Sequence, residues 1–358
     1  MIEYQKIWAN TRYEIITLLR GWFFRIFAGL TIIIFLSINI MFFSGALPFV
    51  PRLFAGFSAA IPYANMIMLN ISQTAIIIFM ASDFFKRDRK YNTAEVFYIR
   101  SMTNGSYLIG KALGIFILFA ALNIIVLAIA LTIHLVFSEA SFNWVPYILY
   151  PLLIGFPAFV FMIGLSFLLM HLIKNQAIVV LLLLGYYAVV LFYLYDKWYY
   201  LFDFIALKLP FAYSDFIGLA NIKLLLLQRG LYFSLGMVCI LVSILLFKRL
   251  TQSAILERLI IIGIVFFIVT GMYCVPNYLQ FFTDRQLLRS RMAILNKQYI
   301  HQPDITPLSC KIDFYHLGET YRATSHYVFQ NLNEAPQDHY LFSINPGLRV
   351  DKILSHRT

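Results

Sequence analysis

Residues 108–137 form the longest apolar stretch of the chain and read LIGKALGIFILFAALNIIVLAIALTIHLVF, with Lys111 as their one charged residue. A helix needs about 20 predominantly apolar residues to cross the bilayer core, so this stretch is long enough to span a membrane. Six further apolar runs of about 17–30 residues are also long enough to cross or nearly cross. They cover residues 27–43, 61–82, 147–170, 177–195, 231–247 and 259–275. The sequence therefore predicts an all-α polytopic membrane protein with about seven transmembrane helices.

The composition of the 358-residue chain agrees with this fold class. Hydrophobic residues make up 61% and charged residues 13%, whereas an ordinary soluble domain has about 45–50% and about 25%. A soluble α/β enzyme, a fibrous protein and a disordered tail are therefore excluded. The net charge of +11 does not indicate nucleic-acid binding, because the cations lie in loops between apolar runs, where membrane topology places them.

The distribution of Lys and Arg predicts the orientation. With the N-terminus inside, the inner segments (residues 1–25, 83–111, 174 and 248–258) hold 14 cations. The outer loops hold five, which are Arg52, Lys197, Lys208, Lys223 and Arg229. By the positive-inside rule, this excess predicts a cytoplasmic N-terminus in the inner (plasma) membrane of the cell. An odd number of spans then places everything after Pro276 on the extracytoplasmic side.

The tail, residues 276–358, differs in character from the membrane part, residues 1–275. Strands are predicted over residues 309–315, 320–331 and 338–345. One alternating face of the second strand carries Tyr321, Ala323, Ser325, Tyr327 and Phe329. Three strands are at best marginally stable alone, so we interpret this β-rich extracytoplasmic segment as the start of a larger domain.

The most informative stretch is the predicted cytoplasmic loop of residues 83–111, DFFKRDRKYNTAEVFYIRSMTNGSYLIGK. It opens with a charged cluster. Thr93 as an N-cap and Glu95 in the first turn then predict a short amphipathic helix. A polar turn at residues 103–106 leads into the next apolar helix. A loop that only supplied positive charge to the inner side would explain the cations but not a helix between two spans.

This loop resembles the first cytoplasmic loop of the permease subunits of type-2 ABC exporters. The family pattern is a charged cluster, Gly-Thr-x-Glu, three or four apolar residues, a Pro and Ser turn, and a Gly-Lys pair that opens the third span. The matching positions are Asp88, Arg89, Thr93, Glu95, residues 96–99, Gly110 and Lys111. The chain departs from the pattern at Asn92, where the family usually has Gly, and at Ser101, where it often has Pro.

The resemblance implies a function and a set of partners. In that family the short helix is the coupling helix, which docks in a cleft of a separate ABC ATPase subunit. The residues implied to make this contact are Asp88, Arg89, Thr93, Glu95, Val96, Phe97 and Ser101. The other implied partners are an identical or different second permease half and membrane lipids. ATP would be bound by the partner subunit, so no cofactor is expected in this chain.

The resemblance also implies two features outside the loop. One is an amphipathic N-terminal helix over residues 2–25, which the mixture of charged and apolar residues there also indicates. The other is an external helical hairpin within residues 196–230, a segment too polar for an ordinary span and too apolar for a loose loop. We expect re-entrant or interfacial helices there.

No pattern in the sequence indicates catalysis. Gly105, Gly110 and Lys111 have the spacing of a phosphate-binding loop, but Ala112 replaces the Ser or Thr that binds Mg²⁺, and a membrane helix follows. Five of the seven histidines lie in the tail without HExxH or another zinc-ligand spacing, so no metal site is predicted. We therefore expect neither an enzyme nor a nucleotide-binding chain.

Polar residues within the second apolar run have two interpretations. Asn65, Asn70 and Gln73 are candidates for a translocation path, because polar groups in hydrocarbon face other helices or a water-filled route. Hydrogen bonds between helices would explain the same residues without any path.

A second hypothesis treats the spans as an anchor for the tail. Residues 310–331 resemble the opening of the β-domain of aminopeptidase N-type metallopeptidases, which are sometimes fused behind ABC permease segments. The chain would then be a membrane anchor that presents an extracytoplasmic peptidase-like or binding domain. A catalytic domain of that kind would lie beyond Thr358, so the resemblance gives no peptidase activity to these residues.

Overall fold

The computed structural model describes most of the chain and divides it into two compact units. The described residues are 3–44, 58–90, 102–137, 142–209, 213–215, 218, 219, 221–247, 253–299, 306–317, 320–331, 342, 344, 345 and 348–354. The first unit is Met1–Arg285 and the second is Gln286–Thr358.

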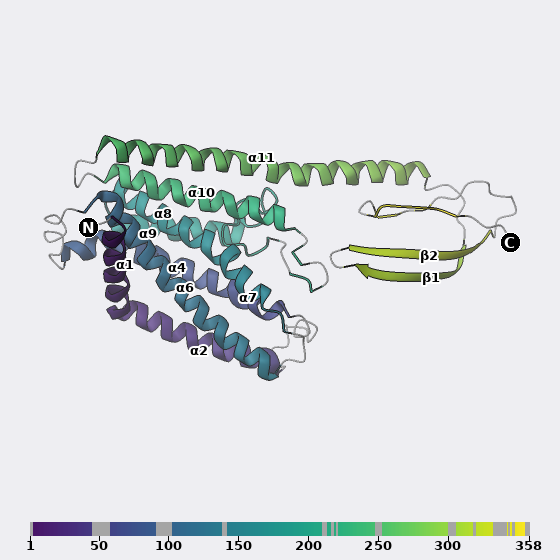
Figure 1. Ribbon diagram of the computed structural model, residues 1–358, viewed down its shortest axis with the longest axis horizontal. Helices are drawn as coiled ribbons and strands as arrows, with labels where there is room; N and C mark the ends of the chain where they lie inside the picture. Colours follow the sequence, from purple (N-terminus) through teal and green to yellow (C-terminus); the bar gives the residue numbers. More distant parts are fainter. Residues whose placement is uncertain are drawn as a thin grey trace. The chain divides into compact units, whose positions relative to one another are not determined.

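The membrane unit is built from long helices (Figure 1). In chain order they are α1 (Glu3–Arg20), α2 (Trp22–Ser44), α4 (Ala60–Lys90), α6 (Asn104–Phe137), α7 (Val145–Tyr150), α8 (Phe156–Ile173), α9 (Gln176–Val189), α10 (Ile222–Leu246) and α11 (Ala254–Tyr299). Within the described residues, seven helical segments are long and apolar enough to cross a membrane, which confirms the predicted number. The structure is 76% helical, as an all-α membrane fold requires.

Two short π-helices complete the spans. The first, η1 (Pro151–Gly155), joins α7 to α8, and the second, η2 (Val190–Leu194), extends α9. Pro151 and Pro157 lie at the start of η1 and of α8. Proline lacks the N–H that continues an α-helix, so a local change of helical pitch at η1 has an identifiable cause.

The turn between α8 and α9 is specified locally. Lys174 adopts a left-handed conformation with φ of 59° and ends α8. Asn175 then caps α9, because its side-chain oxygen accepts the backbone N–H groups of Ala177 and Ile178 at 3.0 and 3.4 Å. Two adjacent spans are thereby reversed within two residues.

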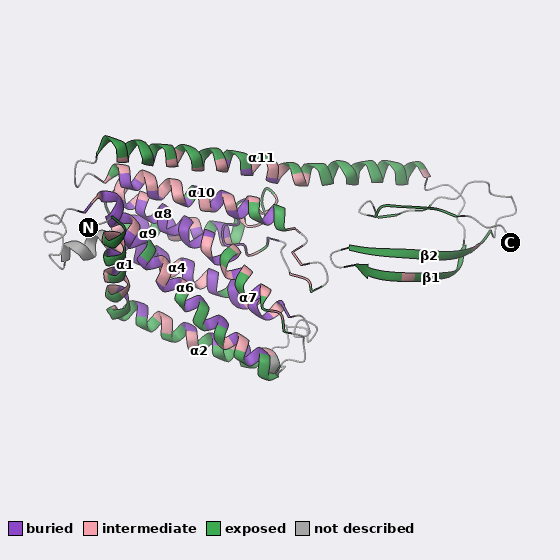
Figure 2. Ribbon diagram, in the orientation of Figure 1, coloured by how far each residue is buried: buried purple, intermediate pink, exposed green. Residues whose placement is uncertain are grey.

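Helix α8 lies at the centre of the membrane unit, and α10 packs tightly against it. Figure 2 shows α8 largely buried, whereas α2 and α11 present mostly exposed side chains. Two glycines allow the close approach of α8 and α10. A Cβ atom on Gly236 would lie 2.7 Å from the backbone of Phe161, and a Cβ on Gly164 would collide with the carbonyl oxygen of Gly236. Small residues at such a crossing are typical of membrane helix pairs.

Helix α11 is longer than the sequence predicts. The run of residues 259–275 was expected to end at Pro276, with a β-rich tail beyond it, but the helix continues through Pro276 to Tyr299. Proline removes one backbone hydrogen bond from a helix, which the following residues can outweigh. Those residues include Leu, Gln, Arg, Met and Ala, which are good helix formers.

The second unit contains a two-stranded antiparallel sheet. Strands β1 (Thr306–Leu317) and β2 (Thr320–Gln330) pair with His316 opposite Tyr321, which confirms the first two predicted strands. The third, residues 338–345, lies mostly outside the described residues, and 342, 344 and 345 are not in a strand. Nearly all side chains of the hairpin are exposed, including Phe314 and Tyr327.

The α8–α10 crossing predicts opposite effects for two Gly→Ala changes. Gly236→Ala should destabilise the protein by about 1–3 kcal/mol, because the added methyl group meets the backbone of α8. Gly185→Ala in α9 is the control, since a Cβ there meets nothing within 4 Å and helix propensity improves by about 0.8–1.0 kcal/mol. The measurement is the midpoint of thermal unfolding in detergent micelles. Equal midpoints for the two variants would show that the helices do not approach closely at Gly236.

Candidate functional site

The predicted coupling residues lie mostly outside the described residues. Thr93, Glu95, Val96, Phe97 and Ser101 fall in the undescribed range 91–101. Asp88 and Arg89 belong to the last turns of α4, where only the backbone is described. The amphipathic helix expected there therefore stays a prediction. What the structure does show is how the chain is held directly after this loop.

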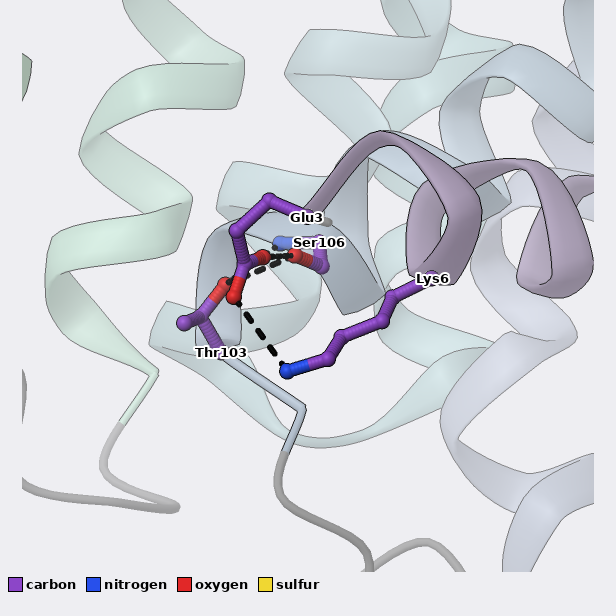
Figure 3. Close-up of polar contacts among 4 residues, drawn as sticks. All are labelled: Glu3, Lys6, Thr103 and Ser106. Carbon is purple, nitrogen blue, oxygen red and sulfur yellow. Dashed lines mark hydrogen bonds and ion pairs between the residues drawn. The ribbon is translucent and has the colours of Figure 1, made fainter. Parts of the chain in front are cut away.

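The chain is bound to α1 where it re-enters the described range. The Glu3 carboxylate accepts hydrogen bonds from the Ser106 hydroxyl and, at 3.2 Å, from the Thr103 hydroxyl, while Lys6 lies 3.5 Å away (Figure 3). Thr103 also caps α6, since its Oγ1 accepts the backbone N–H of Ser106 at 3.1 Å. The hydrogen bond from Ser106 is the main reason that the pKa of Glu3 lies below its usual value. We call Glu3, Lys6, Thr103 and Ser106 the α1–α6 clasp.

A buried ion pair continues the contact one to two turns further along α6. Lys111 Nζ lies 3.0 Å from Glu14 Oε2, and both side chains are fully buried. The Lys111 ammonium also lies 5.3 Å from the centre of the Tyr107 ring. Asn10 donates to the Tyr107 carbonyl at 2.7 Å. A charge of either sign would be costly alone in this environment, so each residue requires the other.

Two glycines bring α1 against α6. A Cβ on Gly110 would lie 2.5 Å from Asn10 Nδ2, and one on Gly114 would lie 2.6 Å from the Cβ of Glu14. They are four residues apart, the spacing of small residues at close helix contacts in membranes. The Gly-Lys pair singled out in the sequence thus has a structural role at this contact: Gly110 admits Asn10, and Lys111 neutralises Glu14.

Helix α1 is amphipathic, but it buries its polar face and exposes its apolar face, whereas a helix on a soluble protein does the reverse. Its buried residues are mainly polar (Asn10, Thr11, Glu14 and Leu18). Its exposed side chains include Tyr4, Trp8, Ile16 and Leu19. An apolar outer face with two aromatic residues suits the boundary between headgroups and acyl chains. This arrangement is what the sequence predicted in outline for residues 2–25, with the polar face now placed on α6.

The candidate path residues do not converge on one point. Asn65 exchanges hydrogen bonds of 2.8 and 2.9 Å with Asn39 of α2, which is an ordinary bond between helices. Asn70 donates to the Ile205 carbonyl at 2.7 Å. Gln73 is fully buried, and neither amide atom has a hydrogen-bond partner among the described residues.

The segment after η2 is not helical in its described residues. Its described residues between Tyr195 and Asn221 form turns and not the expected helical hairpin. Three consecutive residues, Trp198, Tyr199 and Tyr200, have φ of 49°, 56° and 67°. Such left-handed residues cost about 1–2 kcal/mol each, so tertiary contacts must hold them.

Side chains from α10 and α11 bind the carbonyl groups of this segment. Arg229 donates to the carbonyls of Phe204 and Asp203 at 2.8 and 2.7 Å, and Gln228 also reaches that of Asp203. Tyr232 and Tyr278 donate to the carbonyls of Leu201 and Tyr199. Non-helical backbone is tolerated at membrane depth only where protein satisfies it in this way.

Arg229 corrects one detail of the sequence analysis. It was counted among the cations of an outer loop, but it lies in α10 and is only 2% exposed; Lys223, which was counted there too, lies exposed in the first turn of the same helix. The span begins at Ile222, nine residues before the predicted start at 231. The charge is tolerated because backbone carbonyls about 25 residues earlier in the chain bind it.

The described residues hold no group of three or more His, Cys, Asp or Glu that could bind a metal ion. No protein-family model matches the sequence, and no curated protein matches it either.

The buried ion pair predicts strong coupling between its two partners. Glu14→Gln and Lys111→Met should each destabilise the protein by about 3–5 kcal/mol, because each leaves a buried charge unpaired. The double variant should lose much less than the sum of the two. Lys6→Met is the control, since an exposed pair such as Lys6–Glu3 contributes about 0–1 kcal/mol. The midpoints of thermal unfolding of the four variants measure these effects, and additive losses would contradict the pairing.

Proposed function

We propose that this chain is the permease subunit of an ABC exporter. It would move a substrate across the membrane with ATP that a separate ATPase subunit hydrolyses. The chain would pair with an identical or different second permease half, with α1 on the cytoplasmic side of the inner (plasma) membrane and the tail outside. The chain itself would carry out no covalent chemistry.

One structural observation supports this proposal most directly. The loop of residues 91–101 connects two long helices, and the helix that follows it is fastened to α1 by the clasp and by the Glu14–Lys111 pair. A loop that only reversed the chain would need no such anchorage. A loop that receives a push from a partner subunit needs rigid helices on either side of it.

The helices that flank the loop suit such a transmission. Helix α4 has 31 residues and is therefore about 46 Å long at about 1.5 Å per residue. A displacement at its Lys90 end reaches the buried Asn70 and Gln73 through one continuous helix. On the other side of the loop, α6 would carry α1 with it because of the shared buried contacts. Docking of the ATPase on residues 88–101 would in this way rock several helices together.

The second candidate is a membrane anchor that presents an extracytoplasmic peptidase-like or binding domain. The observation in its favour is that residues 286–358 form a compact unit of their own. Its hairpin has exposed Ile312, Phe314 and Tyr321 on one face, and the rings of Phe314 and Tyr321, diagonal neighbours in the register, stack at 5.1 Å. The anchorage of the chain beside the 91–101 loop has no role in that hypothesis, so we place it second.

The proposal predicts that a P-loop ATPase co-purifies with the protein from native membranes in mild detergent. Glu95→Lys should uncouple ATP hydrolysis from transport, at least tenfold, while membrane insertion stays intact, because the reversed charge meets the ATPase at the docking site. Glu257→Lys is the matched control, since it makes the same change at an exposed position in the first turn of α11, outside residues 88–101.

Two results would count against the proposal. Recovery of the protein without any ATPase, under conditions that preserve other ABC complexes, would favour the anchor hypothesis. Unchanged coupling in the Glu95→Lys complex would remove the docking role from residues 93–101 even if an ATPase is bound.

A further inference from the structure

The side-chain amide of Gln73 is buried in the membrane unit without a hydrogen-bond partner among the described residues. Its side chain is fully buried in α4, and neither Nε2 nor Oε1 has a partner among the described residues. One turn earlier, Asn70 is also fully buried and gives its amino group to the Ile205 carbonyl, which leaves its Oδ1 without a partner in the described part of the chain. Unpaired buried amides destabilise a folded protein, so their presence requires an explanation.

Packing between helices does not supply that explanation. Asn65 pairs with Asn39, and Thr74 and Ser166 bond to carbonyls of their own helices. These three side chains are satisfied, but other buried polar side chains in the described structure, such as Asn10 and Asn123, also keep an amide oxygen without a partner. Gln73 differs because, among the residues that the structure describes, it is the one whose buried side chain keeps both polar atoms unpaired, and Asn70, three residues away on the same face of α4, adds a free oxygen.

Asn70 contacts two irregular parts of the membrane unit, which are π-helix η1 and the non-helical segment that follows η2. Asn70 Nδ2 lies 3.4 Å from the carbonyl of Ile154, which belongs to π-helix η1. It also lies 2.7 Å from the carbonyl of Ile205, in the non-helical segment between Tyr195 and Asn221. Single-turn π-helices are frequent at functional sites. Asn70 therefore joins α4 to the two irregular parts of the unit, both of which can change without unwinding a regular helix.

The buried charges of the membrane unit indicate which kind of ligand would suit Gln73 and Asn70. The ionised side chains buried in its helices are bound by the chain itself: Lys111 by Glu14, and Arg229 by backbone carbonyls. The buried Asp203 carboxyl group accepts the backbone N–H of Lys208 at 2.8 Å through Oδ2, while its Oδ1 has no partner among the described residues. The atoms that Gln73 and Asn70 leave free within the described structure belong to neutral amides, which complement a hydroxyl or amide group and bring no charge to neutralise an ionised one.

We infer that Gln73 and Asn70 contact the substrate, and that the part of the substrate they contact is uncharged and bears hydroxyl or amide groups. This inference rests on the proposed transport function. The structure corresponds to the closed form of the site, in which the two amides are removed from water. A substrate that binds the open form satisfies them and shifts the population toward that form.

The test uses cysteine accessibility in the complex with its ATPase. Gln73→Cys and Ile78→Cys are made after Cys239, Cys274 and Cys310 have been replaced by Ala. Ile78 is the matched control because it lies on the same helix and is equally buried. Uncharged N-ethylmaleimide and a positively charged methanethiosulfonate reagent are applied to membranes without nucleotide and with ATP plus vanadate.

In one of the two nucleotide states, N-ethylmaleimide should label the Gln73→Cys variant at least tenfold faster than the Ile78→Cys variant. For each reagent, the rate of labelling of the Gln73→Cys variant is divided by the rate of the same reagent with a free thiol. This ratio should be at least tenfold lower for the charged reagent than for N-ethylmaleimide.

Three results would count against the inference, and they are distinguishable. If the Gln73→Cys variant is as unreactive as the Ile78→Cys variant in both states, the inference is overturned while the co-purified ATPase still supports transport. Equal relative rates for the two reagents overturn the uncharged substrate class. If no ATPase co-purifies, the proposed function fails first, and the inference with it.

A second variant separates substrate contact from a simple packing defect. Gln73→Leu removes the unpaired amide and should raise the midpoint of thermal unfolding. If Gln73 serves the substrate, the same change should lower the transport-coupled ATPase rate at least fivefold, and Gln73→Asn should restore part of it. A higher midpoint with an unchanged ATPase rate would show that Gln73 is a buried imperfection, and would overturn the inference.

Discussion

The buried pair of Glu14 and Lys111 is the interaction on which the membrane unit depends at its α1 end. Neither charge is tolerable without the other, and the pair forms only because Gly110 and Gly114 let α1 approach α6. The surrounding contacts follow from that approach. Asn10 reaches the Tyr107 carbonyl, and Glu3 reaches the capping residues at the start of α6. The apolar side chains of α1 then face outward, where a lipid boundary suits them.

In the segment between Tyr195 and Asn221, backbone carbonyl groups and not charged side chains require hydrogen-bond partners. Left-handed residues at 198–200 break the helical pattern, so the carbonyl groups of this segment lie outside a regular helix. Arg229, Gln228 and two tyrosines bind these groups from neighbouring helices. A cation inside one span is thus the consequence of irregular backbone in another part of the chain. The two features explain each other, and neither would be stable alone.

The spans could be predicted from the sequence because hydrocarbon imposes a length and a composition on each of them. The features that were missed depend on contacts between distant parts of the chain. Arg229 was placed in a loop because its partners, the carbonyls of Asp203 and Phe204, carry no signal in the sequence. The last span was ended at residue 275 because the apolar run ends there, and hydropathy does not show that the helix continues into more polar sequence. Gly110 and Lys111 could be singled out by their motif. Their contact with α1 could not be predicted, because Lys111 and its partner Glu14 are 97 positions apart in the sequence.

That separation has a consequence for the synthesis of the protein. Chains grow at about 5–20 residues per second, so Glu14 leaves the ribosome about 5–20 s before Lys111 does. During this interval the polar face of α1 has no helix to pack on, and it must stay at the aqueous surface of the bilayer. Completion of α6 supplies the partner, and α1 settles only then. Helix α1 is therefore made before α6 but reaches its final position only after α6 is complete.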